Sequence, residues 1–136
     1  MRAPERRGPV HVVTVFLVRN KKVLVLQRSD RVGTYRRKWA GVSGYLEPGE
    51  KPRQRAFQEV REETGLGPES LSFLREGPPV PIKGTHFIVH PFLIRLRRGR
   101  VRLDWEHTSF CWVAPTDLAR LDGVPGLAKA FSTVSE

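Results

Sequence analysis

The sequence contains little cysteine, few acidic residues and no long apolar run. Its single cysteine, Cys111, cannot form an intramolecular disulfide, which favours a reducing, cytoplasmic location. The longest apolar stretch, 12–18, is interrupted by Thr14 and falls far short of the roughly 20 residues that cross a membrane, so no membrane association is expected. No apolar run follows the charged N-terminus, so a secretory signal is not expected either. The length suits one domain over 1–136, with 1–9 as a flexible N-terminal segment.

Acidic residues are outnumbered, since the chain has 24 Lys and Arg against 14 Asp and Glu and a formal net charge of +10. This excess favours anionic partners such as phosphates or nucleic acid. The densest basic stretch is LRRGRVR at 96–102, where arginine alternates with apolar residues and predicts a strand hairpin with one basic face. Such a face either follows the backbone of RNA or another polyanion, or is a solvated sheet edge that charge protects against aggregation.

Hydrophobic patterning predicts an α/β protein. A helix is expected over 51–64, because Pro52 suits a first helical turn and Gly65 suits a left-handed terminator. Runs of β-branched and apolar residues predict strands, and two C-terminal stretches predict short helices. The expected strands are 11–20, 22–29, a short one near 39–43, 69–76, 85–96, 101–105 and 110–115, and the expected short helices are 116–121 and 126–131. This order predicts a mixed sheet with helices on both faces.

Three glutamates crowd the C-terminal half of the predicted helix. Glu59, Glu62 and Glu63 project from one face, where like charges cost roughly 0.2–0.5 kcal/mol per pair. A solvated polar face with local ion pairs is one interpretation. However, Glu47 and Glu50 precede the same helix, and carboxylates that converge are tolerated when a divalent cation lies between them. Oxygen ligands in this number suit Mg²⁺ or Mn²⁺.

The residues from Gly44 to Leu66 resemble the Nudix box, whose pattern is G-x5-E-x7-R-E-U-x-E-E-x-G-U with U a bulky aliphatic residue. The matching positions are Gly44, Glu50, Glu59, Val60, Glu62, Glu63, Gly65 and Leu66. The departure is Gln58, where the family usually has an arginine that helps to orient the next glutamate. Glutamine can hydrogen-bond but lacks the charge, and the sequence leaves open whether Arg55 or Arg61 supplies it.

The resemblance implies a Nudix fold, which is an α/β/α sandwich with a mixed β-sheet and a loop–helix–loop metal site. It also implies a Mg²⁺-dependent pyrophosphohydrolase, with Mn²⁺ as a substitute, that cleaves the diphosphate linkage of a nucleoside diphosphate derivative by attack of a metal-activated water. On this basis Glu59, Glu62 and Glu63 bind the metal, and Glu50 supports the site directly or through water. The general base is left open between Glu59 and Glu106, for which an exposed hairpin position is the competing interpretation.

Four residues ahead of the box are candidates for substrate binding. Arg28, Arg37 and Lys38 are expected to meet phosphates, with solvated charges as the alternative. Trp39 is a candidate stacking surface for a base, although aromatic residues in strands more often belong to the core.

Two other functions are compatible with these residues. Gln58 and the high net charge keep open a catalytically weak Nudix-fold module that binds a nucleotide or RNA. A Nudix-fold isomerase of prenyl diphosphates shares the basic, Trp-containing approach to the box, but the nearly complete box disfavours it. A small nucleotide-type substrate is favoured over RNA as the partner, and the protein is expected to be a monomer or a homodimer.

Overall fold

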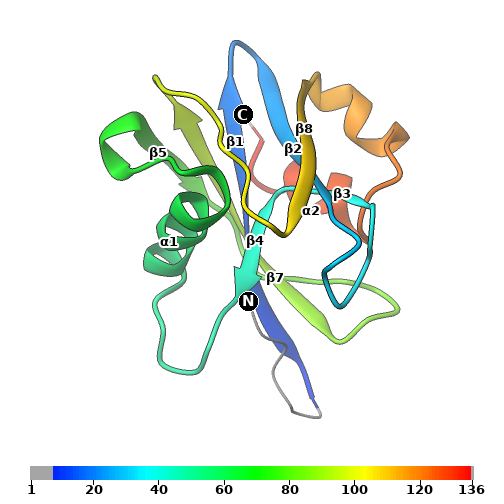
Figure 1. Cartoon of the computed structure of the whole chain (residues 1–136). Coiled ribbons are helices and arrows are strands. Elements are labelled where there is room, and N and C mark those ends of the chain that lie inside the picture. The colour runs from blue at the N-terminus through cyan, green and yellow to red at the C-terminus, as the bar shows by residue number, and fades with distance from the viewer. Residues whose placement is uncertain (1–7, 136) are drawn as a thin grey trace.

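The long strand β1 (Val10–Arg19) organises the fold. The computed structural model describes residues 8–135, and within them β1 runs parallel to β7 (Phe87–Leu96) and antiparallel to both β2 (Lys22–Arg28) and β4 (Val42–Tyr45). Figure 1 shows β1 crossing the middle of the molecule with the other strands on either side. The predicted mixed sheet is therefore confirmed.

The remaining elements extend this sheet and cover it. The short strand β3 and the strand β8 both pair with β2, whereas β5 and β6 pair with β7. Helix α1 lies on one face, and the 3₁₀ segment η2 and helix α2 lie on the other. Their bounds are β3 Trp39–Ala40, α1 Pro52–Thr64, η1 Pro68–Ser70, β5 Leu71–Glu76, β6 Val80–Pro81, β8 His107–Val113, η2 Pro115–Arg120 and α2 Leu127–Ser132.

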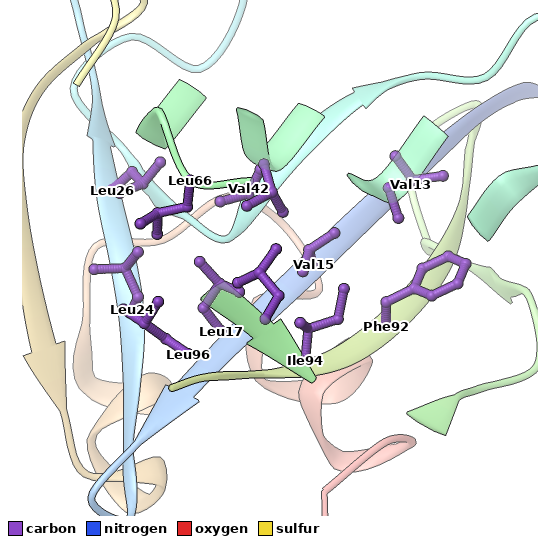
Figure 2. Packing of buried hydrophobic residues seen from close by; sticks show 13 residues of the cluster. Val13, Val15, Leu17, Leu24, Leu26, Val42, Leu66, Phe92, Ile94 and Leu96 are labelled. Atoms are coloured by element: carbon purple, nitrogen blue, oxygen red, sulfur yellow. The ribbon is translucent and has the colours of Figure 1, made fainter. Parts of the chain in front are cut away.

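Two separate apolar clusters show that both faces of the sheet are covered. Alternate residues of β1 point to opposite faces, so Val13, Val15 and Leu17 pack toward α1, whereas Phe16 packs toward α2. Figure 2 shows the first cluster, in which these β1 side chains lie beside Phe92 and other residues of β7. This arrangement is the expected α/β/α sandwich.

Helix α1 follows its local signals closely. Pro52 occupies its first turn, and Gly65 ends it with φ 76° while its N–H donates to the Arg61 carbonyl at 2.9 Å. Its buried positions include Ala56 and Val60, which pack on the first cluster. Glu59 and Glu63 lie on this buried face, whereas Glu62, one turn from Glu59, is exposed at its border.

The segment after β7 differs from its prediction. We expected a return strand at 101–105, but those residues form no strand. The Arg102 N–H instead donates to the Thr64 carbonyl at 2.8 Å, so the backbone binds the end of α1 rather than a neighbouring strand. The two-residue strand β6 lies in a proline-rich stretch for which no strand was predicted, and a proline in such a strand is typical of a sheet edge.

The termini and the helices bear on two further expectations. The expected flexible segment 1–9 falls largely on residues 1–7, which lie outside the described residues. Among residues 8–135, no helix has the length and apolarity required to cross a membrane.

Candidate metal and nucleotide site

Helix α1 lies very close to strand β4 at Gly44. A Cβ atom built at Gly44 would overlap the carboxyl group of Glu59 and lie 2.5 Å from its Cγ. Any larger residue at position 44 would therefore displace the Glu59 side chain. The glycine of the sequence motif and the glutamate 15 positions later form one packed unit.

Glu59 and Glu63 form a buried pair of carboxylates. Each side chain belongs to a residue only 2% exposed. The Glu59 Oε1 atom is the one buried side-chain oxygen or nitrogen in residues 8–135 that has no hydrogen-bond partner. Burial raises the pKa of Glu59, and burial together with the charge of Glu59 raises the pKa of Glu63 well above its ordinary value. Burying these two carboxylates in their ionised form therefore costs free energy, and a cation bound between them would remove that cost.

An arginine one turn earlier holds Glu59 in place. Arg55 Nη1 donates to Glu59 Oε2 at 3.1 Å, and the same guanidinium forms an ion pair with Glu50 through Nη2 and Nε. Glu50 also accepts the Glu47 N–H at 2.7 Å. Hydrogen bonds from Arg55, and after them the bond from Glu47, lower the pKa of Glu50. Glu50 is therefore an ionised anchor for Arg55.

Gln58 and Arg61 do not contact the buried carboxylates. Gln58 Nε2 donates to Glu62 Oε1 at 3.1 Å, and both residues are exposed. Arg61 points instead toward Gly67, where its Nη2 lies 2.7 Å from the position of a built Cβ. Arg55 and Arg61 were the two candidates to supply the positive charge that Gln58 lacks, and Arg55 is the one that pairs with Glu59.

A second group of acidic residues reaches the pair from the start of β8. Glu106 is buried, and its charge contributes to the raised pKa of Glu63. His107 stands between this group and Glu63, with Nε2 at 3.8 Å from Glu63 Oε1 and Nδ1 at 2.8 Å from Asp104 Oδ1. The Ser43 N–H donates to Glu63 Oε1 at 3.2 Å. The interpretation of Glu106 as an exposed hairpin residue is therefore wrong.

An open cleft with a volume of about 90 Å³ is lined in part by strand β4, but by none of these carboxylates. Ser43 and Gly44 line it, and so they connect it to Glu63 and Glu59. Its walls are formed by β1, β2, β3, β4, β7, the loops after β2 and β6, and the loop before α2. The other lining residues are Val12, Thr14, Arg28, Thr34, Tyr35, Ala40, Tyr45, Ile82, Thr85, Phe87, Val89, Val124 and Pro125.

Comparison with known families agrees with this geometry. The sequence model of the NUDIX domain matches residues 8–134. The chain belongs to the NUDIX family. The predicted Nudix fold is likewise confirmed by solved structures: the MutT protein from Methanosarcina mazei Go1 has a TM-score of 0.75, 22% identity and coverage of 96% of this chain and 94% of that one.

Curated relatives extend the comparison to proteins with named activities. The CTP pyrophosphohydrolase of Escherichia coli is 29% identical over 132 residues, which are 90% of this chain and 90% of that protein. An octanoyltransferase of Myxococcus xanthus is 33% identical over 126 residues, which are 83% of this chain. The chain spans only 33% of that octanoyltransferase and 39% of a second curated relative.

The carboxylates of the Nudix box fit a divalent metal ion by their chemistry. No three His, Cys, Asp or Glu side chains in residues 8–135 already converge as a closed metal site. However, Glu59 and Glu63 offer buried carboxylate oxygens, one of them without a partner, and Glu62 lies on the adjacent exposed surface. Mg²⁺ commonly uses one or two carboxylates, with waters and substrate phosphates as its other ligands, so an open donor set suits it.

The structure separates the four candidate substrate-binding residues of this NUDIX protein. Arg28 lines the cleft, where its side chain donates to the Thr34 carbonyl at 3.0 Å. Arg37 is exposed and pairs with Asp30 at 2.5 Å, and Lys38 pairs with Asp122 at 2.5 Å. Trp39 forms β3 and packs against the second apolar cluster. Only Arg28 of the four is among the residues that line the cleft.

Sequence reasoning missed the tyrosines of the cleft. The rings of Tyr35 and Phe87 lie 6.3 Å apart at an angle of 54°. Burial raises the pKa of Tyr45, while the charge of Arg28 lowers it and that of Glu106 raises it. Tyr45 follows Gly44 directly in the sequence, and strand alternation there is the signal that could have placed it in the cleft.

Proposed function

We propose that this chain is a Mg²⁺-dependent pyrophosphohydrolase that cleaves the diphosphate linkage of a nucleotide or nucleotide conjugate. The observation that carries the proposal is the buried pair of Glu59 and Glu63, in which one Glu59 oxygen has no hydrogen-bond partner and the Glu59 carboxyl group packs against Gly44, a residue that lines the cleft. The activity in the name of the similar CTP pyrophosphohydrolase supports the same reaction class. Mn²⁺ is the expected substitute metal.

Each acidic residue has a role in this proposal. Glu59, Glu62 and Glu63 are the metal ligands, and Glu50 supports them through Arg55. A bound Mg²⁺ would neutralise the diphosphate and lower the pKa of water near it. Glu106 is the preferred general base, because burial raises its pKa above the ordinary carboxyl value and so strengthens it as a proton acceptor. Glu59 is the alternative base, although its contact with Arg55 suits a ligand better.

The cleft is the proposed site for the nucleoside part of the substrate. Tyr35 and Phe87 offer aromatic surface for a base, and Arg28 offers a guanidinium for a phosphate oxygen. Ser43 and Gly44 lie between this cleft and the carboxylates, so a diphosphate would follow the base toward Glu63.

The catalytically weak module is the less favoured function. Its support came from Gln58, which lacks the charge that usually orients the next glutamate. Because Arg55 donates to Glu59 from the preceding turn, the substitution at position 58 leaves that orientation intact. A cytoplasmic location, and a monomer or homodimer, complete the proposal.

A hydrolysis screen tests this function directly. The chain would be assayed with Mg²⁺ and with Mn²⁺ against nucleoside triphosphates, nucleotide sugars, ADP-ribose and dinucleoside polyphosphates. We expect one substrate class to be cleaved well above the others, and Glu59→Gln to lower kcat by about 10²- to 10⁴-fold. Glu76→Gln removes an exposed glutamate at the end of β5 and is the matched control. Turnover that survives chelation, or that survives Glu59→Gln, would contradict the proposal.

A further inference from the structure

We propose that the segment 97–106 is a binding surface for a single-stranded oligonucleotide whose terminal phosphates reach the carboxylates of the Nudix box. The inference deepens the proposed hydrolase function, on which it rests, by naming a substrate that extends beyond one nucleotide. It is carried by two independent features, which are unpaired arginines at one end of the segment and exposed aromatic rings on and just beyond its other end.

The segment leads from the far end of β7 to the carboxylates. Figure 1 shows it leaving the upper end of β7 and running down to the start of β8. The Arg97 N–H donates to the Ser70 carbonyl at 2.8 Å, and the Arg102 N–H donates to the Thr64 carbonyl at 2.8 Å. At the other end, the Ser29 N–H donates to the Glu106 carbonyl at 2.7 Å. The path is thus fixed at its start, its middle and its end.

Arginines line the first half of this path. Arg98 and Arg100 are exposed, and neither has an ion pair or side-chain hydrogen bond within residues 8–135. Arg102 is exposed as well and packs beside Gly65 at the end of α1. No acidic residue interrupts 95–103, so this half of the segment carries positive charges alone. Cations without partners attract the phosphates of a nucleic acid backbone.

Aromatic rings lie near the end of the path. Trp105 is 52% exposed, and Phe110 on β8 is 41% exposed; these are the large apolar side chains that residues 8–135 leave open to solvent. The Arg31 guanidinium lies 5.8 Å from the centre of the Trp105 ring. Aromatic rings beside a basic groove are the means by which proteins stack the bases of single strands. Glu106 follows Trp105 directly, so a base on this ring would lie next to the catalytic carboxylates.

The competing explanation for these arginines does not fit the structure. Charge on a strand edge protects a sheet against aggregation. However, 97–106 contains no strand, and its apolar side chains Val101 and Leu103 pack inward on the first apolar cluster. There is no sheet edge here to protect, and the arginines lie on the α1 face, where the carboxylates of the Nudix box also lie.

Binding without turnover tests the surface. The probe is a labelled, 5′-phosphorylated single strand of about 12 nucleotides, as RNA and as DNA, titrated with the full chain in EDTA at several salt concentrations. We expect Arg98→Gln/Arg100→Gln to reduce the slope of log K against log salt by about 1.4, because each lost phosphate contact contributes about 0.7 for single strands. We expect Trp105→Ala to weaken binding by about 5- to 150-fold.

The control variant removes two charges from the opposite face. Arg120→Gln/Lys129→Gln changes η2 and α2, which pack on the second apolar cluster, and should leave the salt slope unchanged. Equal effects of the two double variants, full affinity in Trp105→Ala, or a duplex bound as tightly as a single strand would each overturn the inference. Tighter binding of RNA than of DNA supports the inference and indicates recognition of the 2′-hydroxyl. Equal binding of the two also supports it and indicates recognition of the backbone and the bases alone.

The binding experiment can fail or succeed independently of the hydrolase proposal. A chain that cleaves small nucleotides but binds no single strand overturns this inference alone. A chain that binds single strands through 98, 100 and 105 but cleaves nothing retains the surface and overturns the hydrolase.

Discussion

Replacement of Gly44 by alanine is the sharpest test of the packing between β4 and α1. The added methyl group would overlap the Glu59 carboxyl group and lie 2.5 Å from Glu59 Cγ, whereas carbon atoms normally approach to about 3.5–4.0 Å. The buried Glu59 side chain must therefore move by more than about 1 Å, and the contact with Arg55 and the position of the carboxylate are lost together.

The magnitude follows from the cost of overpacking. An extra methyl group in a closely packed interior destabilises by about 1–3 kcal/mol. For a chain of 136 residues this lowers Tm by roughly 3–12 °C. Activity should fall further than stability, by about 10²-fold or more, because the displaced group is a proposed metal ligand. Gly33→Ala is the control, since a Cβ at Gly33 meets no atom within 4 Å.

Thermal unfolding and turnover of three variants give the measurement. In addition to Gly44→Ala and Gly33→Ala, the double variant Gly44→Ala/Glu59→Ala removes the atoms that the new methyl group would strike. We expect the double variant to regain most of the stability lost by Gly44→Ala, but none of the activity. A Gly44→Ala protein with the Tm and rate of Gly33→Ala would refute the close packing. A double variant no more stable than Gly44→Ala would show that the methyl group clashes with something other than Glu59.

Three further predictions concern charge. Burial and the neighbouring carboxylates raise the pKa of Glu63, so the folded protein loses stability as pH rises above the ordinary carboxyl value of 4.5. In EDTA at pH 8, Glu63→Gln should therefore raise Tm. Added Mg²⁺ should stabilise only the unchanged chain. Burial and the charge of His11 lower the pKa of His90, so stability falls as pH drops below about 6.5, and His90→Gln should lose less Tm than the unchanged chain between pH 7.5 and 5.5. Arg55→Gln should lower kcat by about 10- to 100-fold, whereas Arg61→Gln, which removes a charge directed away from the carboxylates, should leave it close to the original rate.

Local signals in the sequence were sufficient for helix α1 and for the main strands. Pro52, Gly65 and the spacing of Ala56 and Val60 define a helix without help from the rest of the fold. The failures arose where a tertiary contact decides the outcome. The stretch 101–105 has strand-forming residues, but its backbone binds the end of α1. No local pattern contains that information.

In the candidate site too, the features set by local sequence were predicted and those set by tertiary contacts were not. The spacing of the Nudix box placed Glu59 beside Glu63, because residues four apart share a helix face. It could not show that Gly44 packs against Glu59, that Tyr35 meets Phe87, or which cations lie outside the cleft, since these contacts join distant parts of the chain.

The substitution at position 58 illustrates how a helix can move a charge without losing it. On a helix, position 58 faces position 62, and position 55 faces position 59. Gln58 accordingly donates to Glu62, and Arg55 donates to Glu59 from the preceding turn while Glu50 holds the rest of its guanidinium. The buried carboxylate therefore still has a cation beside it, and that cation is itself fixed by a second carboxylate. A variant Gln58→Arg should consequently gain little activity in this chain, whereas the same residue would matter greatly if Arg55 were absent.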